Sequence, residues 1–442
     1  MNNTFIALLI SLVAGVGLIV LLTARYRMHA FFALFAASFF VGICVQMPVP
    51  AILTAMKDGF GHIMKSLGFI IVLGTTLGVL LEYTGSTQVM ARFILKRVGE
   101  RYAAAAMSIT GFIVGMPIFC DSGYIVLSGL SKSLSARTGI ATAIMSASLA
   151  TGLYAVHCLI PPHPGAAAAA GLLQVDFGRL ILVGTLVAIP AAVVGSWWAH
   201  FAGRKFEHVP SVAAEDTIAA GHRQEPTVWQ AFLPVIIPIL LIAAGAAFGK
   251  DTSTAATVCR IMGDPILALT TGVVLAFWGN ISWTKDVVGK LLQDGAEKAG
   301  GILVIIGAGG AFGAVLAATD IGKHFGDALP LGSLGIFFPF LLTFILKTAQ
   351  GSSTVAIITA ASIIHPLLPA LGLQDDTGRM LCVLSMGAGS MMISHANDAY
   401  FWVIAKFSSQ DMKPMLRVYS IATIWMGVVS FACIYLLSLL LR

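Results

Sequence analysis

The stretch that decides the fold is FFPFLLTFILKTAQGSSTVAIITAASII, residues 337–364. Its two ends are apolar, but its centre holds a charged side chain, Lys347, and a helix-breaking glycine, Gly351. Each apolar arm has about 10 to 12 residues, and at 1.5 Å per residue a helix of that length crosses only about half of a bilayer. The stretch is therefore predicted to enter the membrane and return to the same side as a re-entrant hairpin.

The composition is that of a membrane protein. Of the 442 residues, 58% are hydrophobic and 10% are charged, whereas a soluble protein carries about 25% charged residues. The net charge of +6 does not indicate a nucleic-acid partner, because the basic residues of membrane proteins gather in their cytoplasmic loops. The first apolar run, 4–23, is too long for a signal peptide and lacks a basic segment before it, so it is predicted to span the lipid bilayer.

The remaining apolar regions are of two kinds. A spanning helix needs about 20 mostly apolar residues, and the further continuous runs that suit a span are 30–47, 67–83, 179–202, 228–249, 264–279, 301–318 and 416–440. The interrupted regions are 102–131, 140–175, 332–364 and 380–405, and their interruptions read GMPIFCDSG, LIPPHPG, KTAQGSST and ISHAND. Irregular backbone at membrane depth is tolerated only where it is buried in protein or lines a water-filled cavity, so the four interruptions are expected to meet around such a cavity.

The order of these features repeats along the chain. His157, just before LIPPHPG, falls opposite His395 in ISHAND, at an offset of about 235 residues. The sequence therefore predicts two membrane repeats, 1–202 and 228–442, joined by a polar cytoplasmic linker, 203–227.

The predicted fold class is an all-α polytopic membrane protein of two inverted repeats. If 102–131 and 332–364 are re-entrant hairpins and 140–175 and 380–405 are broken helices, each repeat has about five transmembrane helices. An odd number of crossings turns the second repeat upside down relative to the first. The loops assigned to the inside then carry about twice as many Lys and Arg residues as the outside loops, which fits the positive-inside rule. Inverted repeats with broken helices are typical of secondary transporters, whose site lies near the midplane of the membrane.

The interruptions in the second half supply most of the candidate binding groups. Lys347 is the candidate counter-charge for an anionic solute, and the alternative is a surface loop with Lys347 snorkelling to the interface. Asp398 is a candidate proton carrier, and the alternative is a helix N-cap. The candidates for hydrogen bonding to the solute, through side chains or backbone groups at helix ends, are Gln350, Gly351, Ser352, Ser353, Thr354, Ser394, His395 and Asn397.

The interruptions in the first half supply further candidates. A carboxylate inside the membrane is a functional hypothesis by default, so Asp121 is a candidate proton carrier; the alternative is a structural ion pair with Lys347. His157 and His163 flank the Pro-Pro break and are candidates for contacting the solute, with His157 also a candidate proton carrier. The alternative is that His157 bonds a backbone carbonyl freed by the prolines. The remaining candidates for solute binding, at the tip of the first hairpin, are Ser122 and Gly123.

Four motifs resemble those of the gluconate permease family of bacterial proton symporters: HCLIPPHPGAAAAAG, IIGAGGAFG, AQGSSTVAI and SHANDAYFWV. The resemblance covers essentially the whole chain. It implies proton-coupled uptake of gluconate or a related small hydroxylated carboxylate across the bacterial inner membrane, with no catalytic residues, no cofactor and a homodimeric assembly. Some members of the family carry D-serine. Lys347 stands where several members have arginine, and Asp121 where many have glutamate.

Two other interpretations stay open. Polar side chains and freed carbonyls at helix breaks also bind Na⁺, so sodium is an alternative coupling ion. An intramembrane metallohydrolase is a remote alternative, in which His157, His163 and Asp121 bind zinc, since a catalytic zinc needs about three such ligands. The sequence contains no HExxH motif, which argues against a metal site of that kind.

Overall fold

The structure is a computed structural model that describes residues 3–206, 225–247, 253–278, 283–321, 324 and 331–441. All regular elements among these residues are helices, and no strand occurs in the described part of the chain. Most of the predicted linker 203–227 lies outside the described residues.

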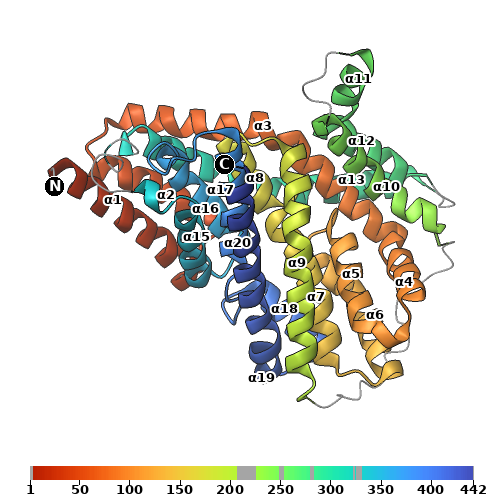
Figure 1. The fold of residues 1–442 in the computed structure, drawn as a ribbon. Helices are drawn as coiled ribbons and strands as arrows, with labels where there is room; N and C mark the ends of the chain where they lie inside the picture. The colour runs from red at the N-terminus through yellow and green to blue at the C-terminus, as the bar shows by residue number, and fades with distance from the viewer. Residues whose placement is uncertain are drawn as a thin grey trace.

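The helices of the first half follow one another with short connections (Figure 1). They are α1 (Asn3–Val20), α2 (Ala30–Cys44), α3 (Val49–Thr84), α4 (Ser86–Val98), α5 (Ala103–Gly115), α6 (Cys120–Thr138), α7 (Thr142–Leu159), α8 (Pro164–Leu173) and α9 (Phe177–Gly203).

The described helices of the second half are α10 (Val228–Ala247), α11 (Thr254–Met262), α12 (Pro265–Ala276), α13 (Lys285–Ala317), α15 (Phe337–Gln350), α16 (Ser353–Ile364), α17 (Asp376–Met391), α18 (Ala399–Ser408), α19 (Met412–Pro414) and α20 (Ile421–Leu441). Two short π-helical segments adjoin helix ends: η1 (Leu21–Arg25) follows α1, and η5 (Met415–Ser420) leads into α20.

Seven helical segments of the described chain are long and apolar enough to cross a membrane, or eight if α11 and α12, bent by 65° at their junction, form one span. The sequence predicts about ten crossings because it also counts α2 and the pair α17–α18. Helix α2 has only 15 residues, and α17 and α18 have 16 and 10. The chain is therefore polytopic, and the exact number of crossings stays a prediction.

Helices α3 and α13 are much longer than the predicted spans 67–83 and 301–318, with 36 and 33 residues. The first half of α3 is amphipathic: Ile52, Met56 and Ile63 are buried, whereas Asp58 and His62 are exposed. A hydropathy average hides this pattern, although spacings of four and seven residues place the apolar side chains on one helical face.

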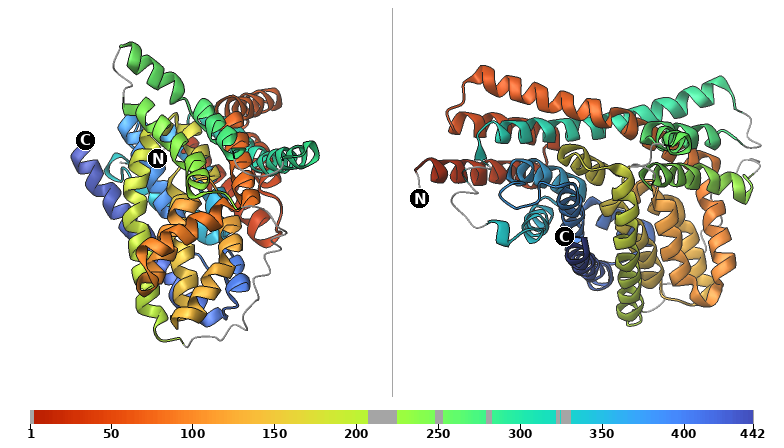
Figure 2. Two further views of the ribbon diagram at one scale, coloured as in Figure 1. Left: turned by 90° about the vertical axis from the view of Figure 1, so that its right-hand side faces the viewer. Right: turned by 45° about the horizontal axis from the view of Figure 1, so that its top comes forward.

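Glycines let α3 and α13 approach closely, as expected for small residues between helices in lipid. A Cβ on Gly59 would overlap the carbonyl oxygen of Gly310, and one on Gly295 would lie 2.6 Å from Thr76 Oγ1. The right-hand view of Figure 2 shows the two helices side by side along one side of the molecule. The glycine-rich stretches therefore serve helix packing.

The helices stop at all four predicted interruptions. Helix α5 gives way to α6 across residues 116–119, and α15 to α16 at Gly351, whose φ of +84° ends the helix in the left-handed conformation. Helix α7 is separated from α8 by residues 160–163, and α17 from α18 by residues 392–398. Helix α6, the predicted second arm of the first hairpin, runs to Thr138, beyond the predicted end at 131.

Helix α7 lies in the core of the molecule, and all of its residues except His157 are buried. It packs against α5, α6, α9 and α17, while α6 contacts α18 and α8 contacts α16. The four helix breaks therefore come from elements that pack on one another, and His157 is the one position of α7 that is not fully enclosed.

Candidate functional site

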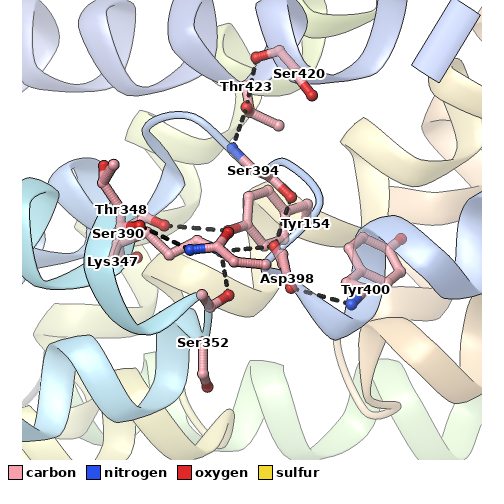
Figure 3. Close-up of polar contacts among 12 residues, drawn as sticks. Tyr154, Lys347, Thr348, Ser352, Ser390, Ser394, Asp398, Tyr400, Ser420 and Thr423 are labelled. Carbon is pink, nitrogen blue, oxygen red and sulfur yellow. Dashed lines mark hydrogen bonds and ion pairs between the residues drawn. The ribbon is translucent and has the colours of Figure 1, made fainter. Parts of the chain in front are cut away.

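A buried ion pair joins the end of α15 to the break between α17 and α18. Lys347 Nζ, in the last turn of α15, lies 2.6 Å from Asp398 Oδ2, and the two side chains are 0% and 7% exposed. The same ammonium donates a 2.6 Å hydrogen bond to the carbonyl oxygen of Gly351. Figure 3 shows the lysine reaching across to the aspartate. An ion pair with so little solvent is costly to break, because a lone buried charge remains.

Asp398 is held from three sides. Its Oδ1 accepts the backbone N–H of Tyr400 at 3.0 Å, so the residue is also the N-cap of α18. Its Oδ2 accepts the hydroxyl of Ser394 at 2.5 Å in addition to the lysine. The backbone N–H of Ser394 is in turn held by Thr423 Oγ1, on α20, at 3.0 Å. The N-cap and the charge-pairing roles of Asp398 therefore coexist.

The hairpin tip and the helix break are fitted to each other. The Asn397 side-chain amide donates to the carbonyl oxygen of Thr348 at 2.7 Å. A Cβ on Gly351 would overlap the carbonyl oxygen of Asn397, so the position requires glycine both for its φ and for space. This contact brings KTAQGSST and SHAND, some 40 residues apart, into one site.

Two histidines tie the first broken helix into the same region. His157 Nε2 lies 3.5 Å from Thr354 Oγ1, at the start of α16. His163 Nε2 lies 2.8 Å from the carbonyl oxygen of Gly115, the last residue of α5. The two rings are 5.1 Å apart. It is His163, the N-cap residue of α8, that binds a carbonyl at a helix break, whereas His157 faces the second hairpin.

Several buried polar atoms near these breaks have no hydrogen-bond partner among the described residues. They are Thr348 Oγ1, both side-chain atoms of Gln350, His157 Nδ1 and His163 Nδ1. Buried polar groups are almost always paired with protein, water or a ligand. These groups therefore have unused hydrogen-bonding capacity beside the helix breaks.

The other predicted site residues have varied environments. Asp121, in the first turn of α6, is exposed and does not pair with Lys347. Ser352 is the N-cap of α16 and accepts from Val355 N–H. Ser122 and His395 are partly buried, Gly123 and Ser353 are buried, and Asn397 is exposed. Lys347 is fully buried and does not snorkel to a surface.

Two tyrosines at the site are absent from the sequence prediction. Tyr154 stacks on His157, with ring centroids 6.3 Å apart, and on Tyr400 at 5.7 Å. The hydroxyl of Tyr154 donates to the carbonyl oxygen of Ser390, and that of Tyr400 to the carbonyl oxygen of Ala150. Tyr154 precedes His157 by three residues, a spacing that places both side chains on one helical face. Tyr154 could therefore have been found from its spacing to His157.

Comparison with known proteins decides the family. The sequence model of the GntP family permeases matches residues 7–440. The chain belongs to the GntP permease family. The gluconate permease of Pseudomonas aeruginosa is 33% identical, covering 100% of this chain and 99% of that protein. The D-serine transporter DsdX of Escherichia coli is 30% identical, with 98% of each chain covered.

The inner membrane permease YgbN of Escherichia coli is 28% identical over 96% of this chain and 97% of its own. Among solved structures, the YdaH transporter of Alcanivorax borkumensis superposes with a TM-score of 0.61 at 15% identity, covering 87% of each chain. This GntP permease is therefore a multi-pass transporter of the bacterial inner membrane and not an enzyme. Among the described residues no group of three His, Cys, Asp or Glu side chains is placed to hold a metal ion.

Proposed function

We propose that this GntP permease takes up gluconate or a related small hydroxylated carboxylate together with a proton. The observation that carries the proposal is the buried pair of Lys347 and Asp398 where the second hairpin meets the second helix break. Like the half-helix ends that form the sites of other transporters, this junction brings a buried cation to a break between helices.

The coupling follows from charge balance. With Asp398 ionised, Lys347 is neutralised and has no need of an external anion. When Asp398 takes a proton, the buried ammonium loses its counter-ion, and an uncompensated buried charge is costly. The carboxylate of the solute then replaces Asp398 as the counter-ion of Lys347. One proton and one anion enter the site together, so the loaded site has the same net charge as the empty one.

We assign the hydroxyls of the solute to the buried polar atoms that have no hydrogen-bond partner among the described residues. Gln350 offers both a donor and an acceptor, and His157 Nδ1 and Thr348 Oγ1 add further sites. A polyol needs both kinds of partner, because each hydroxyl donates one hydrogen bond and accepts others. We assign His163 to support of the first break, since its Nε2 already binds Gly115.

We also propose that the two halves are inverted repeats with re-entrant hairpins. Helices α8 and α18 support a repeat, since both have 10 residues and their first residues, Pro164 and Ala399, are 235 positions apart. Their N-caps, His163 and Asp398, each contact the end of the first hairpin arm of their own half, at Gly115 and Lys347.

The packing of the helices supports a two-fold relation between the halves. Helix α6 contacts α18, and its counterpart α16 contacts α8. Equivalent helices also pack on each other, as in the pairs α3–α13, α7–α17 and α9–α20. Such reciprocal contacts are the signature of a two-fold axis. We therefore propose that the solute site lies where the two pairs of breaks pack together. The homodimer implied by the family resemblance stays a prediction.

A D-serine-like amino acid is the second candidate solute. The relative DsdX is named a D-serine transporter and is 30% identical over nearly the whole chain. An amino acid shares the carboxylate that would bind Lys347 but adds an ammonium group, which needs an acceptor such as Gln350 Oε1 or a carboxylate.

The test is uptake into proteoliposomes that contain the purified permease. Labelled gluconate is offered under an inward proton gradient, under an inward sodium gradient and without a gradient, with unlabelled D-serine as competitor. We expect accumulation only with the proton gradient and weak competition by D-serine. Accumulation driven by sodium alone would overturn the proton coupling, and stronger binding of D-serine would replace the sugar acid by an amino acid.

A further inference from the structure

A cavity of about 550 Å³ lies between the end of α9 and the start of α20. Its walls come from the last turns of α9, the turn from Ser409 to Asp411, and the segment that leads through η5 into α20. The described residues contribute one carboxylate to the lining, Asp411, and three cations, Lys205, Lys413 and Arg417. None of the three cations forms an ion pair among the described residues, so the cavity carries an excess of positive charge.

A neutral donor in the same cavity also lacks a partner. Gln410 lines the cavity, and its Nε2 is buried without an acceptor among the described residues. Three cations and an unused N–H donor form a set that suits an anion with several oxygen acceptors, such as a phosphate group.

The backbone of Arg417 is held by an aromatic side chain of α9. Arg417 belongs to the π-helical segment η5, and its carbonyl oxygen accepts the indole N–H of Trp198 at 3.1 Å. π-helical turns are rare and occur frequently at functional sites. The hydrogen bond ties the end of α9 to η5, so the charged and the aromatic sides of the cavity are held together.

The apolar side of the cavity continues onto the outer surface of the helix pair α9–α20. Trp198, Phe201 and Ile421 line the cavity, and Trp197 and Trp425 beside them are 56% and 41% exposed. Tryptophans gather where a protein crosses the boundary between lipid tails and headgroups. An apolar surface that leads away from a basic cavity suits a ligand with both a phosphate and acyl chains.

We propose that this cavity binds the headgroup of an anionic phospholipid, with its phosphate among Lys205, Lys413 and Arg417 and its acyl chains along α9 and α20. Basic pockets between helices at a membrane surface bind lipid headgroups in this way. The site is separate from the solute site and needs neither Lys347 nor Asp398.

The test measures lipid binding by native mass spectrometry on delipidated permease, with phosphatidylglycerol and phosphatidylcholine of identical chains. We expect preference for phosphatidylglycerol. Each basic residue removed weakens attraction to anionic lipid by about fivefold, so the double variant K413Q/R417Q is expected to bind phosphatidylglycerol roughly twentyfold to thirtyfold more weakly. K406Q, an exposed lysine on α18 that does not line the cavity, serves as the matched control and is expected to bind normally.

A variant that binds the lipid more tightly excludes misfolding as the cause of a change in lipid binding. D411N removes the one carboxylate that the described residues contribute to the lining, and it is expected to tighten phosphatidylglycerol binding several-fold. Inorganic phosphate at the same concentration is expected not to displace the lipid. Equal binding by wild type and K413Q/R417Q overturns the proposal, and displacement by inorganic phosphate overturns the lipid in favour of a free anion.

Discussion

The substitution that tests the buried ion pair most sharply is Asp398→Asn. Asparagine is as good an N-cap as aspartate, so the hydrogen bond to Tyr400 N–H is retained and mainly the charge is lost. Lys347 is then left fully buried with one remaining acceptor, the carbonyl oxygen of Gly351. Removing one partner of a buried pair costs about 3–5 kcal/mol, and we expect D398N to lower the free energy of unfolding by that amount.

The reverse substitution, Lys347→Met, leaves Asp398 with two donors, Ser394 Oγ and Tyr400 N–H. Its cost is expected to lie at the lower end of the same range, about 3 kcal/mol. The double variant K347M/D398N has no buried charge at this site, and replacing a whole buried pair is often nearly neutral. Its cost is therefore expected to be far below the sum of the single costs, with a coupling energy of about 3 kcal/mol or more.

The assay is unfolding of the purified permease by titration of SDS into mixed detergent micelles, carried through the full double-mutant cycle. K347R keeps the charge and serves as the control, with a smaller expected loss than K347M. Additive single costs, with a coupling energy near zero, would refute the view that Lys347 and Asp398 stabilise each other in the native protein.

Three further predictions concern the hairpin, the solute and the topology. G351A is expected to lower the free energy of unfolding by at least about 2 kcal/mol and to abolish transport, because its Cβ would overlap the carbonyl oxygen of Asn397. The control G372A, also at positive φ but with no atom within 4 Å of a Cβ, is expected to cost only about 1 kcal/mol. Equal losses of stability in the two variants would contradict the close fit of Gly351 against Asn397. Q350L breaks no hydrogen bond among the described residues, so it is expected to leave unfolding unchanged and raise KM about tenfold by the loss of a solute hydrogen bond. T359V, which removes another unpartnered hydroxyl, is the control with unchanged KM, and a normal KM in Q350L would remove Gln350 from the site. For the inverted repeats, single cysteines at the exposed positions Ala136 and Gln374 in a cysteine-free background are expected to react with a membrane-impermeant maleimide from opposite sides, and labelling from one side contradicts the inversion.

The helix breaks could be predicted from the sequence because their signals are local. Prolines remove helix hydrogen bonds, Gly351 adopts a left-handed conformation, and polar residues within apolar runs are rare at membrane depth. Each of these features acts within a few residues of the break it causes. The sequence therefore located all four breaks, and placed Lys347, Asp398 and both histidines beside them.

The partner of Lys347 could not be predicted from the sequence, because it depends on which hairpin tip meets which break. The sequence offered Asp121 as the structural partner, but Asp121 is exposed on α6 and the pair forms with Asp398. The lengths of α3 and α13 were also missed. Polar residues such as Asp58 lie on the exposed face of a helix that continues past them, and a window of average hydropathy cannot separate the two faces.

Proton uptake on solute binding tests the exchange of counter-ions at Lys347 most directly. Gluconate is titrated into the purified permease by calorimetry in buffers of different ionisation enthalpy, which gives the number of protons taken up per solute bound. Wild type is expected to take up about one proton per gluconate, since exchange of counter-ions requires protonation of one carboxylate. D398N is expected to bind gluconate with no linked proton and to be stabilised by it more than wild type is. A D398N protein that still takes up one proton per gluconate would contradict the account.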